Sequence, residues 1–185
     1  MDKTFTWTVD TETDWGGRTS GIQGLTDGLP RILETFRAFK VKALFFVSSE
    51  LALENRGAIT RIIEHGHEIG SHGHFHIRYK DKWRSKQDKD ISERLLSIFN
   101  QKKMEYRAPW FNYETDSLYS KRPHHVSILK QTWFGGRLPE NPIFYIHPFD
   151  IVKGVNPPNL FTRLLYGKPD AVFDTFKRLV RLYPR

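Results

Sequence analysis

The sequence predicts an α/β fold in which a parallel sheet is covered by helices. Short apolar or β-branched segments alternate along the chain with longer amphipathic segments, a pattern typical of parallel α/β proteins. Polar side chains directly follow several of the predicted strands, where α/β proteins keep their chemistry. A chain of 185 residues can bury a sizeable core, so we expect a single domain over residues 1–185.

The predicted strands cover residues 4–10, 42–47, 67–70, 105–108, 125–132 and 143–146. The first alternates threonine with larger apolar side chains and ends at Asp10. The second is almost wholly apolar, as expected of a strand buried on both faces. Pro109 ends the fourth, because proline cannot donate a hydrogen bond to a neighbouring strand.

The predicted helices cover residues 25–40, 58–65, 91–101 and 169–183, where apolar side chains recur with helical spacing. Pro30 near the start of the first helix suits a first helical turn. Gly66 is a natural C-terminal stop for the second. The strongly charged residues 78–90 are predicted to form a loop.

Composition narrows the functional classes. There are no cysteines, which excludes disulfides and thiol catalysis. No apolar run approaches the roughly 18 residues of a membrane span, and no signal peptide is recognisable, so a cytoplasmic location is expected. The net charge is +8, but the basic residues are scattered and no nucleic-acid-binding motif is present. We therefore expect no nucleic acid partner, and a solvated basic surface or peripheral contact with a membrane or anionic glycan.

The segment from His65 to His76 holds five of the chain's 8 histidines. His72 and His76 are four residues apart, so one turn of helix would place both imidazoles on one face. Two histidines arranged in this way can bind one Zn²⁺ ion. For an isolated pair with this spacing, a surface cluster without function is the competing interpretation.

Further polar signals fall at the ends of other predicted strands, at Asp10, Glu12, Asp14, Arg107, Trp110 and His147. Each is weak by itself, since a carboxylate after a strand is most often a helix cap or a turn former. Together with the histidines they supply metal ligands, a general base, an arginine that keeps the base ionised, and a general acid. These are the groups that metal-assisted hydrolysis requires.

At these motifs the chain resembles the polysaccharide deacetylases, the family of chitin and peptidoglycan deacetylases. The resemblance extends from residue 4 to about residue 148. It depends on the combination of Val9-Asp10, Ala43-Leu-Phe-Phe-Val47, His67-Glu-Ile-Gly-Ser-His72 with His76, Arg107-Ala-Pro-Trp110, and Ile146-His147-Pro148. It implies a distorted, incomplete (β/α) barrel with its site at the C-terminal ends of the strands. The chain is short for this barrel, so strand–helix units are expected to be missing.

The resemblance also implies a role for each matching residue. Asp10 would be the general base and Arg107 its tether. His72 and His76 would be metal ligands, and His147 would be the general acid. The implied cofactor is Zn²⁺ or another divalent transition metal such as Co²⁺ or Ni²⁺.

The backbone N–H of Trp110 would help the metal to stabilise the oxyanion. Trp15, Trp83 and Trp133 are, like Trp110, expected on or beside loops, where an aromatic face could stack on a sugar ring. The substrate implied by the resemblance is a saccharide, and the sequence does not indicate an oligomeric state.

The carboxylate ligand has two candidates, because Asp10 is followed by Thr11 and not by the second aspartate typical of the family. The pattern resembles the family's Asp-x-Glu branch, in which some relatives have lost the metal. If the first strand continued, Glu12 would lie about 6–7 Å along from Asp10 and Asp14 about 13 Å. Glu12 is therefore favoured, with Asp14 as the alternative. The acidic and tryptophan motif that orients the general acid in the family has the candidates Asp116, Trp133 and Asp150.

The expected function is metal-dependent removal of acetyl groups from a saccharide, by N-deacetylation, in glycan or cell-surface polysaccharide biosynthesis. One alternative is a non-catalytic saccharide-binding domain on the same fold. The other is a metal-free amidase acting on non-peptide C–N bonds.

Overall fold

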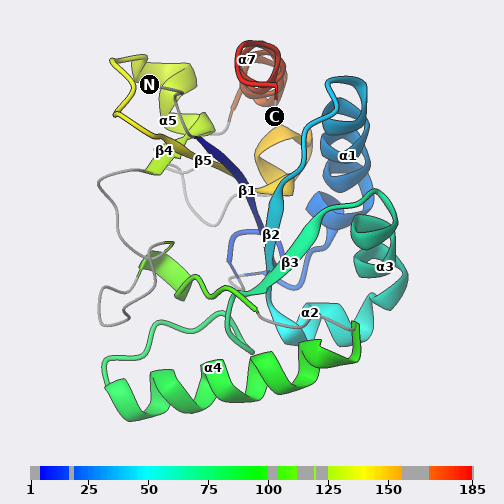
Figure 1. Ribbon diagram of the computed structural model, residues 1–185, viewed down its shortest axis with the longest axis vertical. Helices are drawn as coiled ribbons and strands as arrows, with labels where there is room; N and C mark the ends of the chain where they lie inside the picture. The colour runs from blue at the N-terminus through cyan, green and yellow to red at the C-terminus, as the bar shows by residue number, and fades with distance from the viewer. Residues whose placement is uncertain are drawn as a thin grey trace.

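The structure is a computed structural model that describes residues 5–16, 19–99, 104–111, 119, 125–155 and 167–184 (Figure 1). A 5-stranded sheet runs through it in the order β3-β2-β1-β5-β4. The strands are β1 (Thr6–Thr11), β2 (Leu44–Val47), β3 (Glu68–Ser71), β4 (His125–Ser127) and β5 (Ile143–Ile146). Each pairing is parallel, which confirms the predicted α/β class.

The helices are α1 (Leu29–Ala38), α2 (Ser49–Glu54), α3 (Arg56–Glu64), α4 (Lys82–Leu96), α5 (Ile128–Phe134) and α7 (Pro169–Leu182). Figure 1 shows α1 and α3 to the right of the sheet, α7 at the top and α4 along the bottom. A parallel bridge between Ser71 and Tyr106 continues the sheet beyond β3. Within the described residues the sheet does not close on itself, so the fold is an incomplete barrel. No helix in these segments is both long and apolar enough to span a membrane.

The hydrophobic core packs helices α1, α2, α3, α5 and α7 against the sheet. Trp7 of β1 stacks on Phe144 of β5, with ring centroids 4.5 Å apart. Its ring also meets Phe36 of α1 and Phe176 of α7 edge to face. All four side chains are buried. Aromatic side chains bury large areas, so this cluster fixes β1 and β5 against the two helices.

The opposite face of β1 is polar. Side chains alternate along a strand, so Thr8 and Asp10 point away from Trp7. On this side both accept hydrogen bonds from the guanidinium of Arg107, which is wholly buried. The strand therefore packs against the core with one face and presents polar groups, including the carboxylate of Asp10, on the other.

The prediction of a loop over residues 78–90 holds for residues 78–81 but is wrong from Lys82 on, where α4 begins. The side chain of Asp81 caps this helix by accepting a hydrogen bond of 2.8 Å from the N–H of Trp83. The buried side of α4 consists of Ser85, Asp88, Ser92 and Leu96. Because this side is mostly polar, no apolar periodicity marks residues 82–90 as helical in the sequence.

Two predicted strands are shorter than expected. β4 ends at Ser127, whose side chain accepts a hydrogen bond from the N–H of Lys130, and residues 128–132 are helical. Residues 105–108 contribute only the bridge at Tyr106. The short helix α2 was not predicted, because six residues hold too few turns for a periodic pattern.

The remaining predicted helices are confirmed with shifted ends. The segment 25–40 forms a π-helical turn over Gly24–Gly28 followed by α1, and α3 and α7 match 58–65 and 169–183 closely. Residues 91–96 of the predicted helix 91–101 form the C-terminal end of α4, and Ser97–Phe99 is a 3₁₀ turn. The last two residues of that prediction, and the start of the first predicted strand at residue 4, lie outside the described residues.

Candidate active site

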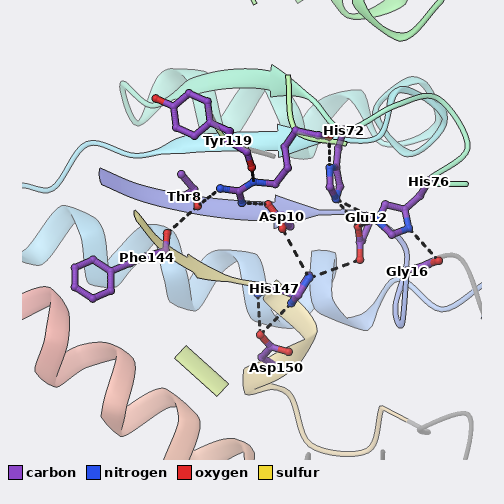
Figure 2. Close-up of polar contacts among 11 residues, drawn as sticks. Thr8, Asp10, Glu12, Gly16, His72, His76, Tyr119, Phe144, His147 and Asp150 are labelled. Atoms are coloured by element: carbon purple, nitrogen blue, oxygen red, sulfur yellow. Dashed lines mark hydrogen bonds and ion pairs between the residues drawn. The ribbon is translucent and has the colours of Figure 1, made fainter. Parts of the chain in front are cut away.

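Glu12, His72 and His76 form a buried cluster just beyond the C-terminal ends of β1 and β3 (Figure 2). Oε2 of Glu12 lies 3.0 Å from Nε2 of His72 and 2.5 Å from Nε2 of His76. The two histidine nitrogens are 3.1 Å apart. The potential ligand atoms all lie within 4.8 Å of one another, the compact arrangement that a single metal ion needs.

The predicted helical turn between the two histidines is wrong. The backbone N–H of His72 donates to the carbonyl of Val47 at 2.9 Å, and the chain then leaves β3 as an irregular loop. Gly73 and His76 have positive φ angles of 78° and 53°, which a right-handed helix does not allow. The loop, and not helical spacing, therefore brings the two imidazoles together.

Backbone carbonyls fix the orientation of both imidazoles. Nδ1 of His72 donates to the carbonyl of Arg107 at 2.8 Å, and Nδ1 of His76 donates to that of Gly16 at 3.1 Å. A carbonyl only accepts, so the proton of each neutral imidazole is on Nδ1 and the lone pair of Nε2 points at Glu12. Hydrogen bonds of this kind orient histidine ligands in metalloproteins.

The charge state of Glu12 also bears on whether Glu12, His72 and His76 can bind a metal ion. Burial alone would raise the pKa of Glu12, but His76 and His72, when they carry a proton on Nε2, hold that pKa well below its usual range. Glu12 is therefore an ionised carboxylate that faces two Nε2 atoms, and positive charge at this point, from protons or from a metal ion, stabilises the cluster. The three side chains therefore fit a divalent transition metal, which takes histidine and carboxylate ligands.

Asp14, the alternative carboxylate, lies elsewhere. Its side chain accepts hydrogen bonds of 2.8 Å from the N–H of Gln23 and 2.9 Å from that of Gly24. The chain turns after Glu12, so Asp14 ties this turn to the π-helical segment before α1. The structure thus brings Glu12, and not Asp14, to the two histidines.

Asp10 and Arg107 form a buried ion pair beside the cluster. The guanidinium donates to Oδ1 of Asp10, to the hydroxyl of Thr8 at 2.9 Å and to the carbonyl of Tyr119 at 3.0 Å. The ring of Phe46 lies 4.3 Å from the guanidinium carbon and shields it from water. Burial would raise the pKa of Asp10, but Arg107 and nearby imidazoles lower it, so this carboxylate is ionised near neutral pH.

His147 follows β5 and faces the same space. Its Nε2 lies 3.9 Å from Oδ2 of Asp10 and 3.9 Å from Oε1 of Glu12, and its side chain is 21% exposed. Burial would lower the pKa of His147, but the carboxylates of Asp150, Glu12 and Asp10 raise it to about 9. The imidazole can therefore carry a proton at neutral pH and give it to a group in the site.

Asp150 is the carboxylate that orients His147. From the sequence it was one of three candidates for this role, with Asp116 and Trp133. Its Oδ2 accepts from Nδ1 of His147 at 3.2 Å and from the backbone N–H of the same residue at 2.8 Å. Trp133 lies on α5 and packs against the core, and Asp116 lies outside the described residues. The useful signal in the sequence was an acidic residue three positions after His147, because a 3₁₀ turn over Pro148–Ile151 folds it back.

Trp110 borders the cluster, with its ring centroid 5.3 Å from that of His76. It is 37% exposed and has a positive φ of 58°. The predicted role of its backbone N–H stays a prediction. Of the other tryptophans, Trp15 is buried against Phe149, while Trp83 is exposed at the start of α4.

The geometry defines a class of protein. Possible metal ligands, an ionised aspartate and a protonatable histidine meet at the C-terminal ends of parallel strands, an arrangement typical of α/β hydrolases. The model of one protein family, described as polysaccharide deacetylase, matches residues 3–126. The chain belongs to the polysaccharide deacetylase family, as its motifs indicated.

Similar proteins are known by sequence and by structure. The peptidoglycan-N-acetylglucosamine deacetylase PgdA of Listeria monocytogenes is 31% identical over 72 residues, which are 39% of this chain and 16% of that protein. BA3943 of Bacillus anthracis, described as a CE4 family pseudoenzyme, has a TM-score of 0.64 at 17% identity over 99% of this chain and 62% of its own. The peptidoglycan deacetylase PdaC of Bacillus subtilis has a TM-score of 0.61 at 18% identity, over 97% and 84%. At these identities the two structures establish the shared fold.

Proposed function

We propose that this protein is a metal-dependent hydrolase that removes N-acetyl groups from a saccharide. One observation carries the proposal: Nε2 of His147 lies 3.9 Å from a carboxylate oxygen of Asp10 and 3.9 Å from one of Glu12, which belongs to the candidate metal site formed with His72 and His76. An acid and a base thus face one small volume beside three ligand atoms. Amide hydrolysis needs this combination, because water must lose a proton and the amine must gain one.

Glu12, His72 and His76 would hold the metal, with Zn²⁺ first and Co²⁺ or Ni²⁺ as alternatives. A divalent metal at this position supplies Lewis-acid polarisation and lowers the pKa of water. The chain contributes rigidity, because both imidazoles are oriented through Nδ1 before any ion arrives.

Asp10 has the position of the general base. Its Oδ1 is held by Arg107, so Oδ2, which faces His147, is the oxygen that would take a proton from water. The oxygen of that water forms a bond to the acetamide carbon as the proton leaves. The low pKa of Asp10 ensures that the carboxylate is ionised when substrate binds.

His147 has the position of the general acid. Its Nδ1 is engaged by Asp150, so the transferable proton is on Nε2. When the C–N bond breaks, this proton would pass to the departing nitrogen, and acetate and the free amine would leave. The proposed oxyanion donor is the backbone N–H of Trp110.

The two alternatives make different demands on the chain. A domain that only binds saccharide does not need an oriented acid and base, and a metal-free amidase does not need Glu12, His72 and His76 in contact. The presence of both sets supports the metal-dependent hydrolase. Polysaccharide deacetylation by the family supports an N-acetylated saccharide as substrate, and glycan or cell-surface polysaccharide biosynthesis as the setting.

The test is acetate release from N-acetylated chito-oligosaccharides, with added Zn²⁺ and after chelation. We expect that chelation abolishes turnover and that added Zn²⁺ restores it. The variant His72→Gln should show no turnover. His74→Gln is the matched control, because His74 lies in the same loop but its Nδ1 contacts the hydroxyl of Ser49. Turnover that survives chelation would support the metal-free amidase. A zinc-loaded protein that binds these saccharides without releasing acetate would support the binding domain.

A further inference from the structure

The loop that follows His72 and leads to α4 carries exposed apolar side chains. Phe75 and Ile77 are each 47% exposed and flank the buried His76, and Trp83 is 63% exposed in the first turn of α4. Single exposed apolar residues are normal on protein surfaces. Three such side chains within nine residues, beside a candidate active site, need a reason.

The same segment is strongly basic. Residues 75–86 contain five basic side chains, Arg78, Lys80, Lys82, Arg84 and Lys86, and a single acidic one, Asp81. All of these are exposed. The Asp81 carboxylate is engaged as the cap of α4, and Lys86 pairs with Asp90 on the helix surface. The segment therefore combines a bulky apolar surface with excess positive charge.

The segment is held as one unit by Asp88. This buried residue of α4 accepts a hydrogen bond from the N–H of His74 at 2.9 Å and another from the hydroxyl of Tyr79 at 3.3 Å. Both ends of the loop 74–79 are thus tied to the helix that follows it. Helix α4 lies along the bottom edge of the molecule in Figure 1, and the apolar and basic side chains of residues 75–86 that are named above are exposed to solvent.

We propose that residues 75–86, the interfacial segment, bind the surface of an anionic lipid bilayer. Trp, Phe and Ile side chains enter the boundary between headgroups and acyl chains, while Lys and Arg side chains meet anionic headgroups. An anionic glycan would use the charges but has no place for Ile77. Because His76 lies inside this segment, the surface would present the site to a saccharide carried on lipid, a consequence that rests on the proposed deacetylation.

Co-sedimentation with vesicles tests the proposal without any turnover. We expect the full chain to sediment with phosphatidylcholine vesicles that contain phosphatidylglycerol, and not with phosphatidylcholine alone. Added salt should release it, because screening weakens the charge contacts. The triple variant Phe75→Ser, Ile77→Ser, Trp83→Ser should bind about tenfold or more weakly, as expected when several apolar side chains are lost from an interface.

Phe134→Ser with Leu182→Ser is the matched control, since both side chains are more exposed than Trp83 but lie on α5 and α7. This control should bind as the wild type does. The single variant Trp83→Ser should bind the anionic vesicles several-fold more weakly than the wild type. The proposal is wrong if the protein does not sediment with anionic vesicles at low salt. It is also wrong if the triple variant binds them like the wild type, because charge alone would then explain binding and an anionic glycan would be the better partner.

Discussion

At the scale of single residues, the site depends on pairs in which one side chain sets the state of another. Arg107 is wholly buried, and its guanidinium is the partner of Asp10. Arg107→Met keeps the volume but leaves a buried carboxylate unpaired, so the free energy of unfolding should fall by about 3–5 kcal/mol. Urea denaturation measures this change. Arg94→Met, on the exposed side of α4, should stay within about 0.5 kcal/mol, and equal losses in the two variants would refute the argument.

His147 and Asp150 are the second such pair. His147→Gln should lower kcat by about 10²–10⁴ and leave bound metal unchanged. Asp150→Asn should lower kcat less and move the alkaline limb of the pH profile to lower pH. The reason is that Asp150 raises the pKa of His147, so removing its charge lets the imidazole lose its proton earlier. A limb that stays in place would mean that Asp150 only shapes the turn after β5.

The sequence predicted which residues form the site, but it did not predict how the backbone brings them together. Asp10, Glu12, His72, His76, Arg107 and His147 were all named, and the structure brings them together. The helical turn used to pair the histidines does not exist. Nothing in the sequence pattern fixes the path of a loop, since that path depends on hydrogen bonds to distant segments such as Gly16 and Arg107.

At the scale of elements, the loop from β3 to α4 is where local backbone geometry controls the site. Gly73 has φ +78°, and a Cβ there would lie 2.5 Å from Oδ2 of Asp88. Gly73→Ala should therefore destabilise the fold and weaken metal binding, because the loop must move away from α4. Gly135 has φ +56° with nothing within 4 Å of a built Cβ, so Gly135→Ala adds backbone strain alone.

Thermal unfolding and zinc titration compare the two variants. We expect Gly135→Ala to cost about 1 kcal/mol with zinc affinity unchanged. Gly73→Ala should cost more and lower zinc affinity. If Gly73→Ala binds zinc like the wild type, the contact with Asp88 does not position the histidines.

The elements predicted correctly from the sequence are those with apolar periodicity, such as α1 and α7, or with a continuous apolar run, such as β2 and β5. The first part of α4, residues 82–90, was missed because its buried face is built on serine and aspartate, which serve as hydrogen-bond partners for the loop before it. β4 was extended too far because Ser127 starts a helix within an apolar stretch. In both cases side-chain hydrogen bonds, and not hydrophobic spacing, decide the structure.

At the scale of the whole molecule, His67 links stability to pH. It is buried against Phe36 and Phe45, and its Nδ1 accepts a hydrogen bond from the N–H of Ala43 at 3.2 Å. Burial lowers the pKa of His67 to about 4, helped by the charge of Lys42. Between about pH 6.5 and 4 the unfolded chain binds a proton that the folded chain does not, so stability falls as pH falls.

The variant His67→Phe has no imidazole to bind this proton, so its free energy of unfolding should fall less steeply as the pH falls. The difference in slope should approach about 1.4 kcal/mol per pH unit in this window, and vanish above about pH 7. Urea denaturation at several pH values measures it. Parallel curves for the variant and the wild type would show that His67 titrates normally in the folded protein.

The fold and the family were predictable from the sequence, because strand-end motifs in a parallel sheet converge whatever the loops do. That the chain forms a single domain over residues 1–185 stays a prediction. The central claim is that Glu12, His72 and His76 hold a catalytic metal. Glu12 is in contact with both histidines, whereas Asp14 is engaged by the N–H groups of Gln23 and Gly24.

The most direct test is the amount of zinc bound per chain in Glu12→Gln and Asp14→Asn, measured by elemental analysis after dialysis. The wild type and Asp14→Asn should each retain about one zinc ion per chain, and Glu12→Gln should lose most of it. Loss of zinc from Asp14→Asn alone, or a wild-type protein that binds no stoichiometric zinc, would contradict the account.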